Sequence, residues 1–281
     1  MAYTAEISRA NPTCFLFLID QSGSMGERFG GDLNKTKAQG VADAINRLLK
    51  TLITRCSKGD YIADRYLVGL IGYGGEVSLG FPIDALAGSI LQPVSLIDQN
   101  PLRIEERVRR SDDGTGRLLE QRVMLPTWLE PKAAGKTPMC GAFHAAYDVI
   151  CRFVSEHPAC FPPIVINITD GIATDGAAAR VLQWAMALRG LASQDGNVLL
   201  LNVHVSARGE RPILLPTDET NLPDDYARLL FRMSSPLPPA MLRQAQILEE
   251  SVSDGAVGFA FNAALASVFM FLDIGTRGDT R

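Results

Sequence analysis

A loop that carries one carboxylate and two hydroxyls follows the first apolar run of the chain. Asp20, Ser22 and Ser24 alternate directly after residues 14–19 (CFLFLI), and Gly23 lacks a Cβ where the backbone must turn sharply. Carboxylate and hydroxyl oxygens are hard ligands, which suit Mg²⁺, Mn²⁺ or Ca²⁺ better than zinc or copper. The loop therefore predicts a divalent-cation site, with Mg²⁺ as the expected ion and Mn²⁺ or Ca²⁺ as alternatives.

A second carboxylate and a third hydroxyl are expected at the same place. Asp170 follows the apolar run 163–169 (PIVINIT) as Asp20 follows the first run. Ligands of open α/β sheets bind beyond the carboxyl ends of strands, so neighbouring strands would bring the two carboxylates together. Thr137 precedes Pro138, which fits the first turn of a helix, so its hydroxyl is expected on this same edge. Each motif alone can be a plain turn, and their shared position at element ends favours a metal site.

The rest of the chain alternates short apolar runs with segments of helical period, which is typical of a parallel sheet covered on both faces. Strands are predicted at residues 14–19, 66–73, 163–169, 198–205 and 257–261, and helices at 41–53, 139–154, 178–191 and after Asn262. Gly74-Gly75 predicts a turn into an antiparallel edge strand at 76–82, and Asp32 or Asn34 is the expected cap of the first helix. The predicted fold class is α/β, with a doubly wound, mostly parallel, Rossmann-like sheet and one antiparallel edge strand.

We interpret residues 1–281 as a single domain with two long insertions. Residues from about 85 to 132 hold IEERVRR and RLLEQRV around SDDGTG, which predicts a β-hairpin arm that adds little to the core. This arm is rich in arginines that either bind an acidic partner or form a solvated face: Arg103, Arg107, Arg109, Arg110, Arg117 and Arg122. Residues from about 207 to 255 begin with a proline-rich stretch, which is expected to be irregular apart from a short helix near 225–233.

The motifs resemble the metal-ion-dependent adhesion site of von Willebrand factor A (vWA) domains. The likeness rests on Asp20-x-Ser22-Gly23-Ser24, on Thr137 at the start of a helix, and on the strand-terminal Asp170-Gly171. It covers residues 12–82, 133–206 and 256–275 and leaves out both insertions. The resemblance implies that Ser22, Ser24 and Thr137 coordinate the metal directly, whereas Asp20 and Asp170 act mainly through bridging water. The phrases SGSM and ITDG look most like cytoplasmic bacterial members such as the TerY-like proteins.

The vWA resemblance implies a non-catalytic adaptor or scaffold in a bacterial signalling, stress-response or defence system. A metal with one open position would take an Asp or Glu of a partner protein, and four neighbouring residues are expected to contact that partner: Gln21, Met25, Lys136 and Gly171. The expected partners are a Ser/Thr kinase, a PP2C-type phosphatase or an AAA+ ATPase encoded nearby. Two alternatives stay open, a metal-assisted phosphoester hydrolase and a metal-dependent RNA-binding module.

Enzyme motifs are incomplete in this sequence. Gly135-Lys136-Thr137 would need a further glycine five residues earlier to form a phosphate-binding loop, but Glu130 stands there. The serines lack the GxSxG elbow of a nucleophile, and all three histidines are expected to be structural or at the surface: His144, His157 and His204. We therefore expect a protein that is not an enzyme.

Composition argues against several partner classes. The chain has 27 basic and 31 acidic residues, a formal charge of −4, so neither a nucleic-acid nor a membrane footprint is indicated. No signal peptide is expected, and the apolar stretch 258–275 is interrupted by polar residues and short for a membrane span. Five cysteines without a CxxC pair are expected to be reduced small hydrophobic side chains: Cys14, Cys56, Cys140, Cys151 and Cys160. These features predict a cytoplasmic protein.

Overall fold

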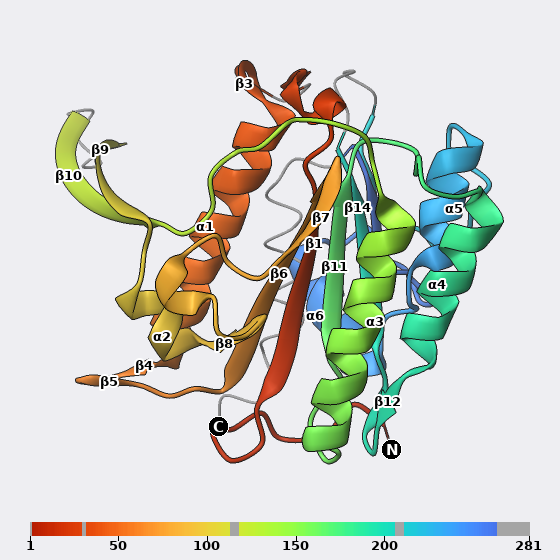
Figure 1. Cartoon of the computed structure of the whole chain (residues 1–281), viewed down its shortest axis with the longest axis horizontal. Coiled ribbons are helices and arrows are strands. Elements are labelled where there is room, and N and C mark those ends of the chain that lie inside the picture. Colours follow the sequence, from red (N-terminus) through yellow and green to blue (C-terminus); the bar gives the residue numbers. More distant parts are fainter. Residues whose placement is uncertain (1, 30–31, 113–117, 206–210, 263–281) are drawn as a thin grey trace.

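The structure is a computed structural model that describes the chain apart from residues 1, 30–31, 113–117, 206–210 and 263–281. An eight-stranded sheet lies at its centre, in the order β15-β16-β14-β11-β1-β6-β7 with β8 also paired to β6 (Figure 1). Its strands are β1 (Thr13–Asp20), β6 (Tyr66–Gly74), β7 (Glu76–Leu79), β8 (Leu91–Pro93), β11 (Ile164–Thr169), β14 (Leu199–His204), β15 (Ile213–Leu214) and β16 (Phe259–Phe261). Smaller elements are β2 (Arg28–Phe29), β3 (Asp32–Thr36), β4 (Ser57–Lys58), β5 (Tyr61–Ile62), β12 (Ala192–Ser193), β13 (Gly196–Asn197) and the 3₁₀ turns η1 (Gly23–Gly26) and η2 (Asp84–Leu86).

The sheet is mostly parallel, which confirms the predicted fold class. β1 pairs in parallel with β6 on one side and β11 on the other, and β14 joins β11 to β16 in the same direction. β7 is the predicted antiparallel edge strand, while β8 and β15 add antiparallel pairs that were not predicted. The chain leaves β1 towards β6 and later returns to β11, so the strand order reverses beside β1. Ligand sites of open α/β sheets lie at such a point.

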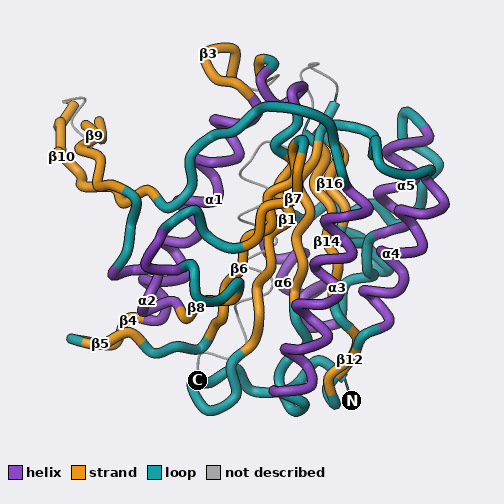
Figure 2. The backbone as a smooth tube through the Cα atoms, viewed as in Figure 1, coloured by secondary structure: helices purple, strands orange, loops and turns teal. Residues whose placement is uncertain are grey.

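Helices cover both faces of the sheet (Figures 1 and 2). On one face lie α1 (Lys37–Cys56), α2 (Val94–Gln99) and α6 (Pro239–Leu248), and on the other α3 (Met139–Glu156), α4 (Ala178–Gly190) and α5 (Asp225–Met233). Phe15 and Phe17 of β1 pack with the first group, whereas Leu16 and Leu18 pack with the second. Because both of its faces are buried, β1 is a continuous apolar run rather than an alternating one. Within the described residues, no helix has the length and apolar character needed to cross a membrane.

The first helix starts later than its predicted cap. Thr36 is the N-cap: its backbone N–H donates to Gln39 Oε1 at 2.8 Å, and its hydroxyl accepts from the Gln39 backbone N–H at 3.2 Å. This reciprocal pair is a capping box. The prediction of Asp32 or Asn34 as the cap is wrong because both belong to β3, which pairs with β2. Lys37 is therefore the first residue of α1.

The first insertion is smaller than predicted. Only β9 (Arg103–Asp112) and β10 (Leu118–Thr127) form the hairpin arm, which pairs with itself and extends from the body at the left of Figure 1. The remainder of 85–132 belongs to the core, through β8 in the main sheet and through five buried side chains: Leu86, Val94, Ile97, Trp128 and Leu129. The expectation that the whole segment adds little to the core is wrong, because apolar residues at both ends of the arm pack beneath α1.

The second insertion is more regular than predicted. Its short helix is α5, at the predicted residues 225–233, and Asp224 caps it by accepting from the Ala227 N–H at 2.7 Å. The segment also supplies α6 and the edge strand β15, and both pack onto the sheet. The helix predicted after Asn262 lies outside the described residues.

Candidate metal centre

The carboxyl ends of β1 and β11 bring four of the predicted metal-site residues together. In register, Ile19 lies beside Ile168, so Asp20 ends its strand where Asp170 leaves the next one. Ser24 Oγ donates to Asp170 Oδ1 at 2.8 Å, and the hydroxyls of Ser22 and Ser24 are 3.1 Å apart. Two hydroxyls and one carboxylate oxygen thus form a continuous polar cluster at the strand ends.

Thr137 contributes the third hydroxyl of this cluster. A Cβ placed on Gly171 would lie 3.7 Å from Ser24 Oγ and 3.8 Å from Thr137 Oγ1, so both hydroxyls are close to the same point. Asp20 lies below them and is held in place, since its Oδ1 accepts from the Ser22 N–H at 2.9 Å and its Oδ2 from the Thr169 hydroxyl at 2.7 Å. The structure therefore gathers all five residues that the sequence singled out.

The loop after β11 holds Thr137 in position. The Thr137 N–H donates to Thr174 Oγ1 at 3.0 Å, and the Thr174 N–H donates to the Thr137 carbonyl at 2.9 Å. Asp175 accepts from the Cys140 and Gly141 N–H groups at 3.0 and 2.8 Å, which caps the first turn of α3. Sequence reasoning missed both residues, although a signal was present: Thr-Asp-Gly occurs at 169–171 and again at 174–176.

Glycines allow three loops to meet at backbone distance around the cluster. The Gly23 N–H donates to the Gly135 carbonyl at 3.0 Å, and the Ala134 N–H donates to the Gln21 carbonyl at 2.7 Å. Gly135 has φ +77°, and a Cβ there would lie 2.6 Å from Gly75 Cα. A side chain at this position would therefore separate the Thr137 segment from the turn between β6 and β7.

A buried lysine completes the site, and sequence reasoning gave it no role. Lys37 Nζ lies 2.7 Å from Asp170 Oδ2, and these two side chains are only 5% and 0% exposed. It also lies 2.9 Å from Glu27 Oε2 and 3.4 Å from the Ser24 carbonyl oxygen. Burial opposes the charge of Lys37, but its hydrogen bonds with Asp170 and Glu27 outweigh that effect and raise its pKa. Nothing in the sequence marks a lysine at a helix start as buried.

The electrostatics of the cluster suit a hard cation. Burial raises the pKa of Asp20 against hydrogen bonds from Ser22 and Thr169, and repulsion by Asp170 raises it further. A cation between the two carboxylates would relieve that repulsion. In the described part of the chain no three His, Cys, Asp or Glu residues form a metal-binding group, so a cation at this cluster would need the hydroxyls as ligands. Three hydroxyls and two carboxylates fit Mg²⁺ by their chemistry.

Of the four residues expected to contact a partner, Met25 is the one for which the expectation is wrong. Its side chain is 0% exposed and packs in the core beneath η1, so it has no surface to offer. Lys136 is exposed, and Gln21 and Gly171 are half-buried. Ile172, which sequence reasoning missed, is 68% exposed next to Gly171. The surface around the hydroxyls therefore combines a cationic and an apolar side chain.

His204 at the end of β14 lies beside this cluster. Its ring stacks on Phe261 at 4.7 Å between centroids and lies edge-on to Tyr226, whose hydroxyl is 3.1 Å from Thr169 Oγ1. Burial lowers the pKa of His204 to about 4, and its Nδ1 has no hydrogen-bond partner among the described residues. The neutral imidazole therefore acts as a packing group, as expected from the sequence.

Acid should destabilise the domain through His204. In the unfolded chain the imidazole gains its proton near pH 6.5, but in the folded chain it gains one only near pH 4. The free energy of unfolding should fall as pH drops through this window, by up to about 3 kcal/mol. Urea unfolding at pH 7, 5.5 and 4.5 should show a shallower loss for His204→Phe than for the unaltered chain. Parallel pH dependences for the two proteins would contradict this assignment.

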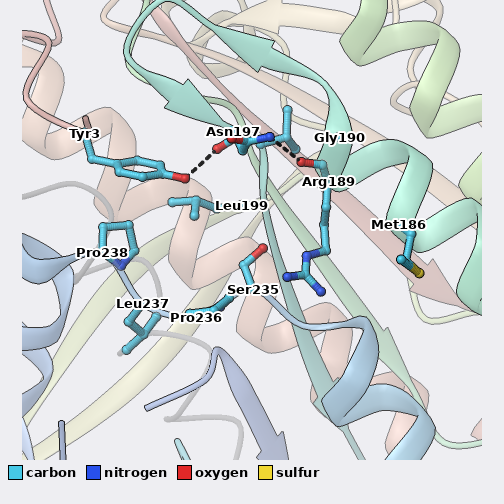
Figure 3. Close-up of a pocket in the computed structure, with 11 residues that line it drawn as sticks. Tyr3, Met186, Arg189, Gly190, Asn197, Leu199, Ser235, Pro236, Leu237 and Pro238 are labelled. Atoms are coloured by element: carbon cyan, nitrogen blue, oxygen red, sulfur yellow. Dashed lines mark hydrogen bonds between the residues drawn. The ribbon is translucent and has the colours of Figure 1, made fainter. Parts of the chain in front are cut away.

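A separate hollow of about 520 Å³ lies at the opposite end of β14 (Figure 3). Its polar groups are already paired: the Tyr3 hydroxyl donates to the Asn197 carbonyl at 3.2 Å, and Asn197 Nδ2 donates to the Arg189 carbonyl at 3.1 Å. Arg189 Nη1 donates to the Arg232 carbonyl at 3.1 Å, at the last turn of α5. These contacts join the N-terminal segment, α4 and α5. The polar groups that line the hollow therefore have a structural role.

Comparisons with known proteins give structural neighbours alone. No family model matches the chain, and no curated protein matches it. A solved von Willebrand factor type A structure from Catenulispora acidiphila is 15% identical, covers 69% of this chain and 33% of its own, and has a TM-score of 0.39. The vWF domain of the type V pili tip protein Mfa5 from Porphyromonas gingivalis is 13% identical, covers 60% of this chain and 40% of its own, and has a TM-score of 0.34. The chain thus spans well under half the length of either neighbour.

Proposed function

We propose that this chain is a vWA-type, metal-dependent protein-binding module. Ser22, Ser24 and Thr137 would hold Mg²⁺, or Mn²⁺ or Ca²⁺, together with Asp20 and Asp170. The bound cation would supply an electrophilic position for an Asp or Glu side chain of a partner protein. The convergence of Ser24, Thr137 and Asp170 beside Gly171 is the observation that carries this proposal.

The charge of the cluster favours binding of an acidic ligand. Hydroxyl ligands are neutral, and Lys37 offsets one of the two carboxylates, so the positive charge of a bound cation would not be fully neutralised by the chain. Lys136 adds a further exposed cation near Thr137, and Ile172 offers apolar contact area. Buried apolar contacts beside a desolvated charge pair are typical of interface hot spots. A TerY-like setting, with a kinase, a PP2C-type phosphatase or an AAA+ ATPase as partner, belongs to the same proposal.

Asp20→Asn tests the metal site with little change in shape. The amide oxygen can still accept from the Ser22 N–H, but the carboxylate charge is lost, so Mg²⁺ affinity should fall about 100-fold. Without metal the variant should be no less stable than the unaltered chain, since burial and Asp170 disfavour the ionised carboxylate. Calorimetric titration with Mg²⁺ and urea unfolding in EDTA measure the two effects.

Asp60→Asn is the matched control, because it removes the same charge from an exposed turn between β4 and β5. Its Mg²⁺ affinity should equal that of the unaltered chain. Equal affinities in the unaltered chain, Asp60→Asn and Asp20→Asn would place any bound Mg²⁺ elsewhere. No binding of Mg²⁺, Mn²⁺ or Ca²⁺ by the unaltered chain would reject the proposed function.

A further inference from the structure

The two oxygens of Asp170 contact different groups. Oδ1 accepts from the Ser24 hydroxyl, within the cluster proposed to hold the metal, and Oδ2 contacts Lys37 Nζ. Lys37 is the first residue of α1, and its capped helix start and buried side chain fix the ammonium in this place. Lys37 therefore neutralises Asp170 through the carboxylate oxygen that the Ser24 hydroxyl does not contact.

Lys37 changes the net charge of the buried cluster. Asp20 and Asp170 together carry −2, and Lys37 brings the buried cluster to −1, while Glu27 on the outer side of the lysine is 62% exposed and screened by water. A divalent cation would bring the cluster to +1, and one partner carboxylate would then bring it to zero. Without Lys37 the cation alone would reach zero, and the carboxylate would leave a net negative charge in a buried place.

We propose that the buried positive charge of Lys37 couples the binding of a divalent cation to the binding of an acidic ligand. It weakens the site for a divalent cation alone and strengthens the loaded site for a carboxylate. This inference rests on the proposed function. Each effect should be about tenfold, because the charges are separated by a single carboxylate group in a partly dehydrated site. The two effects have opposite signs, and a merely structural lysine would not produce that pattern.

Lys37→Met tests the inference, because methionine keeps the length of the buried stem and removes the charge. Calorimetry should show Mg²⁺ binding about tenfold tighter than in the unaltered chain. Acetate, the simplest carboxylate probe, should bind the Mn²⁺-loaded variant about tenfold more weakly, as measured by the relaxation of water protons on Mn²⁺. In EDTA the variant should melt at a lower temperature, since Asp170 is left buried without its charged partner. Mg²⁺ should raise the melting temperature of the variant more than that of the unaltered chain.

Three further variants make the result decisive. Lys37→Arg keeps the charge and should behave like the unaltered chain. Lys37→Gln keeps a hydrogen-bond donor without the charge and should show the same two changes in affinity as Lys37→Met, so it serves as the uncharged variant if Lys37→Met folds poorly. Lys35→Met removes a charge from a partly exposed ion pair with Asp43 and should leave both affinities unchanged. Weaker or unchanged Mg²⁺ binding in folded Lys37→Met and Lys37→Gln would overturn the inference while the metal site stands. Absence of Mg²⁺, Mn²⁺ and Ca²⁺ binding in the unaltered chain and in every variant would reject the proposed function, and the inference with it.

Discussion

Replacing Trp128 by alanine is expected to lower the free energy of unfolding by about 4 kcal/mol. The indole is fully buried in the core, and its Nε1 donates to the Ile97 carbonyl at 2.6 Å. Its backbone N–H donates to Asn46 Oδ1 at 2.8 Å, which ties the end of the hairpin segment to α1. The substitution leaves a large cavity and removes one of the two hydrogen bonds that the Ile97 carbonyl accepts, the other coming from the Asn100 N–H at 3.1 Å. Urea unfolding followed by far-UV circular dichroism measures the loss.

The hairpin arm provides the matched comparison. Arg103 and Thr127 are paired neighbours at its base, so residues 104–126 can be replaced by a short Gly-Ser linker without moving the ends. The expected change in unfolding free energy is within about 1 kcal/mol, because β9 and β10 pair only with each other and closing a shorter loop costs little. A deletion as damaging as Trp128→Ala would show that the arm is part of the core.

Replacing Asn167 by leucine should cost about 3 kcal/mol, because it breaks a buried polar chain across the sheet. Asn167 Oδ1 accepts from the Tyr73 hydroxyl at 2.7 Å, and its Nδ2 donates to Asn202 Oδ1 at 2.9 Å. Asn202 Nδ2 in turn donates to Ser234 Oγ at 2.9 Å, at the C-terminal end of α5. Leucine would remove the acceptor of the Tyr73 hydroxyl and the donor to Asn202 Oδ1 in a fully buried layer.

A double-mutant cycle checks this reasoning. Tyr73→Phe alone should cost about 1 kcal/mol, since it deletes one hydrogen bond. Tyr73→Phe combined with Asn167→Leu should cost less than the sum of the single changes, because the hydroxyl that loses its acceptor to leucine is then absent. Denaturant midpoints for the four proteins give the coupling energy. Strict additivity would mean that the two side chains act independently, contrary to the contact seen between them.

Local patterns in the sequence are enough to predict the parallel strands of the sheet and the chemistry of the loops that follow them, although not the edge pairs made by β8 and β15. Residues 14–19 and 163–169 are continuous apolar runs because their strands are buried on both faces, and Asp20 and Asp170 follow directly where each strand ends. Such features depend on local periodicity and on the geometry of parallel strands. The amino-acid sequence alone therefore places the hydroxyls of Ser22, Ser24 and Thr137 beside the two carboxylates.

The side chains that surround that cluster are brought there by tertiary contacts. Lys37 meets Asp170 across 133 positions of the chain, and Thr174 meets Thr137 across 37. Met25 stands within the loop motif yet faces the core, and Trp128 anchors a segment whose charged pattern predicted only an exposed arm. Periodicity predicts which face of a single helix or strand is buried. It does not predict which residues of different elements come into contact. The charge that Lys37 brings to Asp170 is therefore a property of the folded chain.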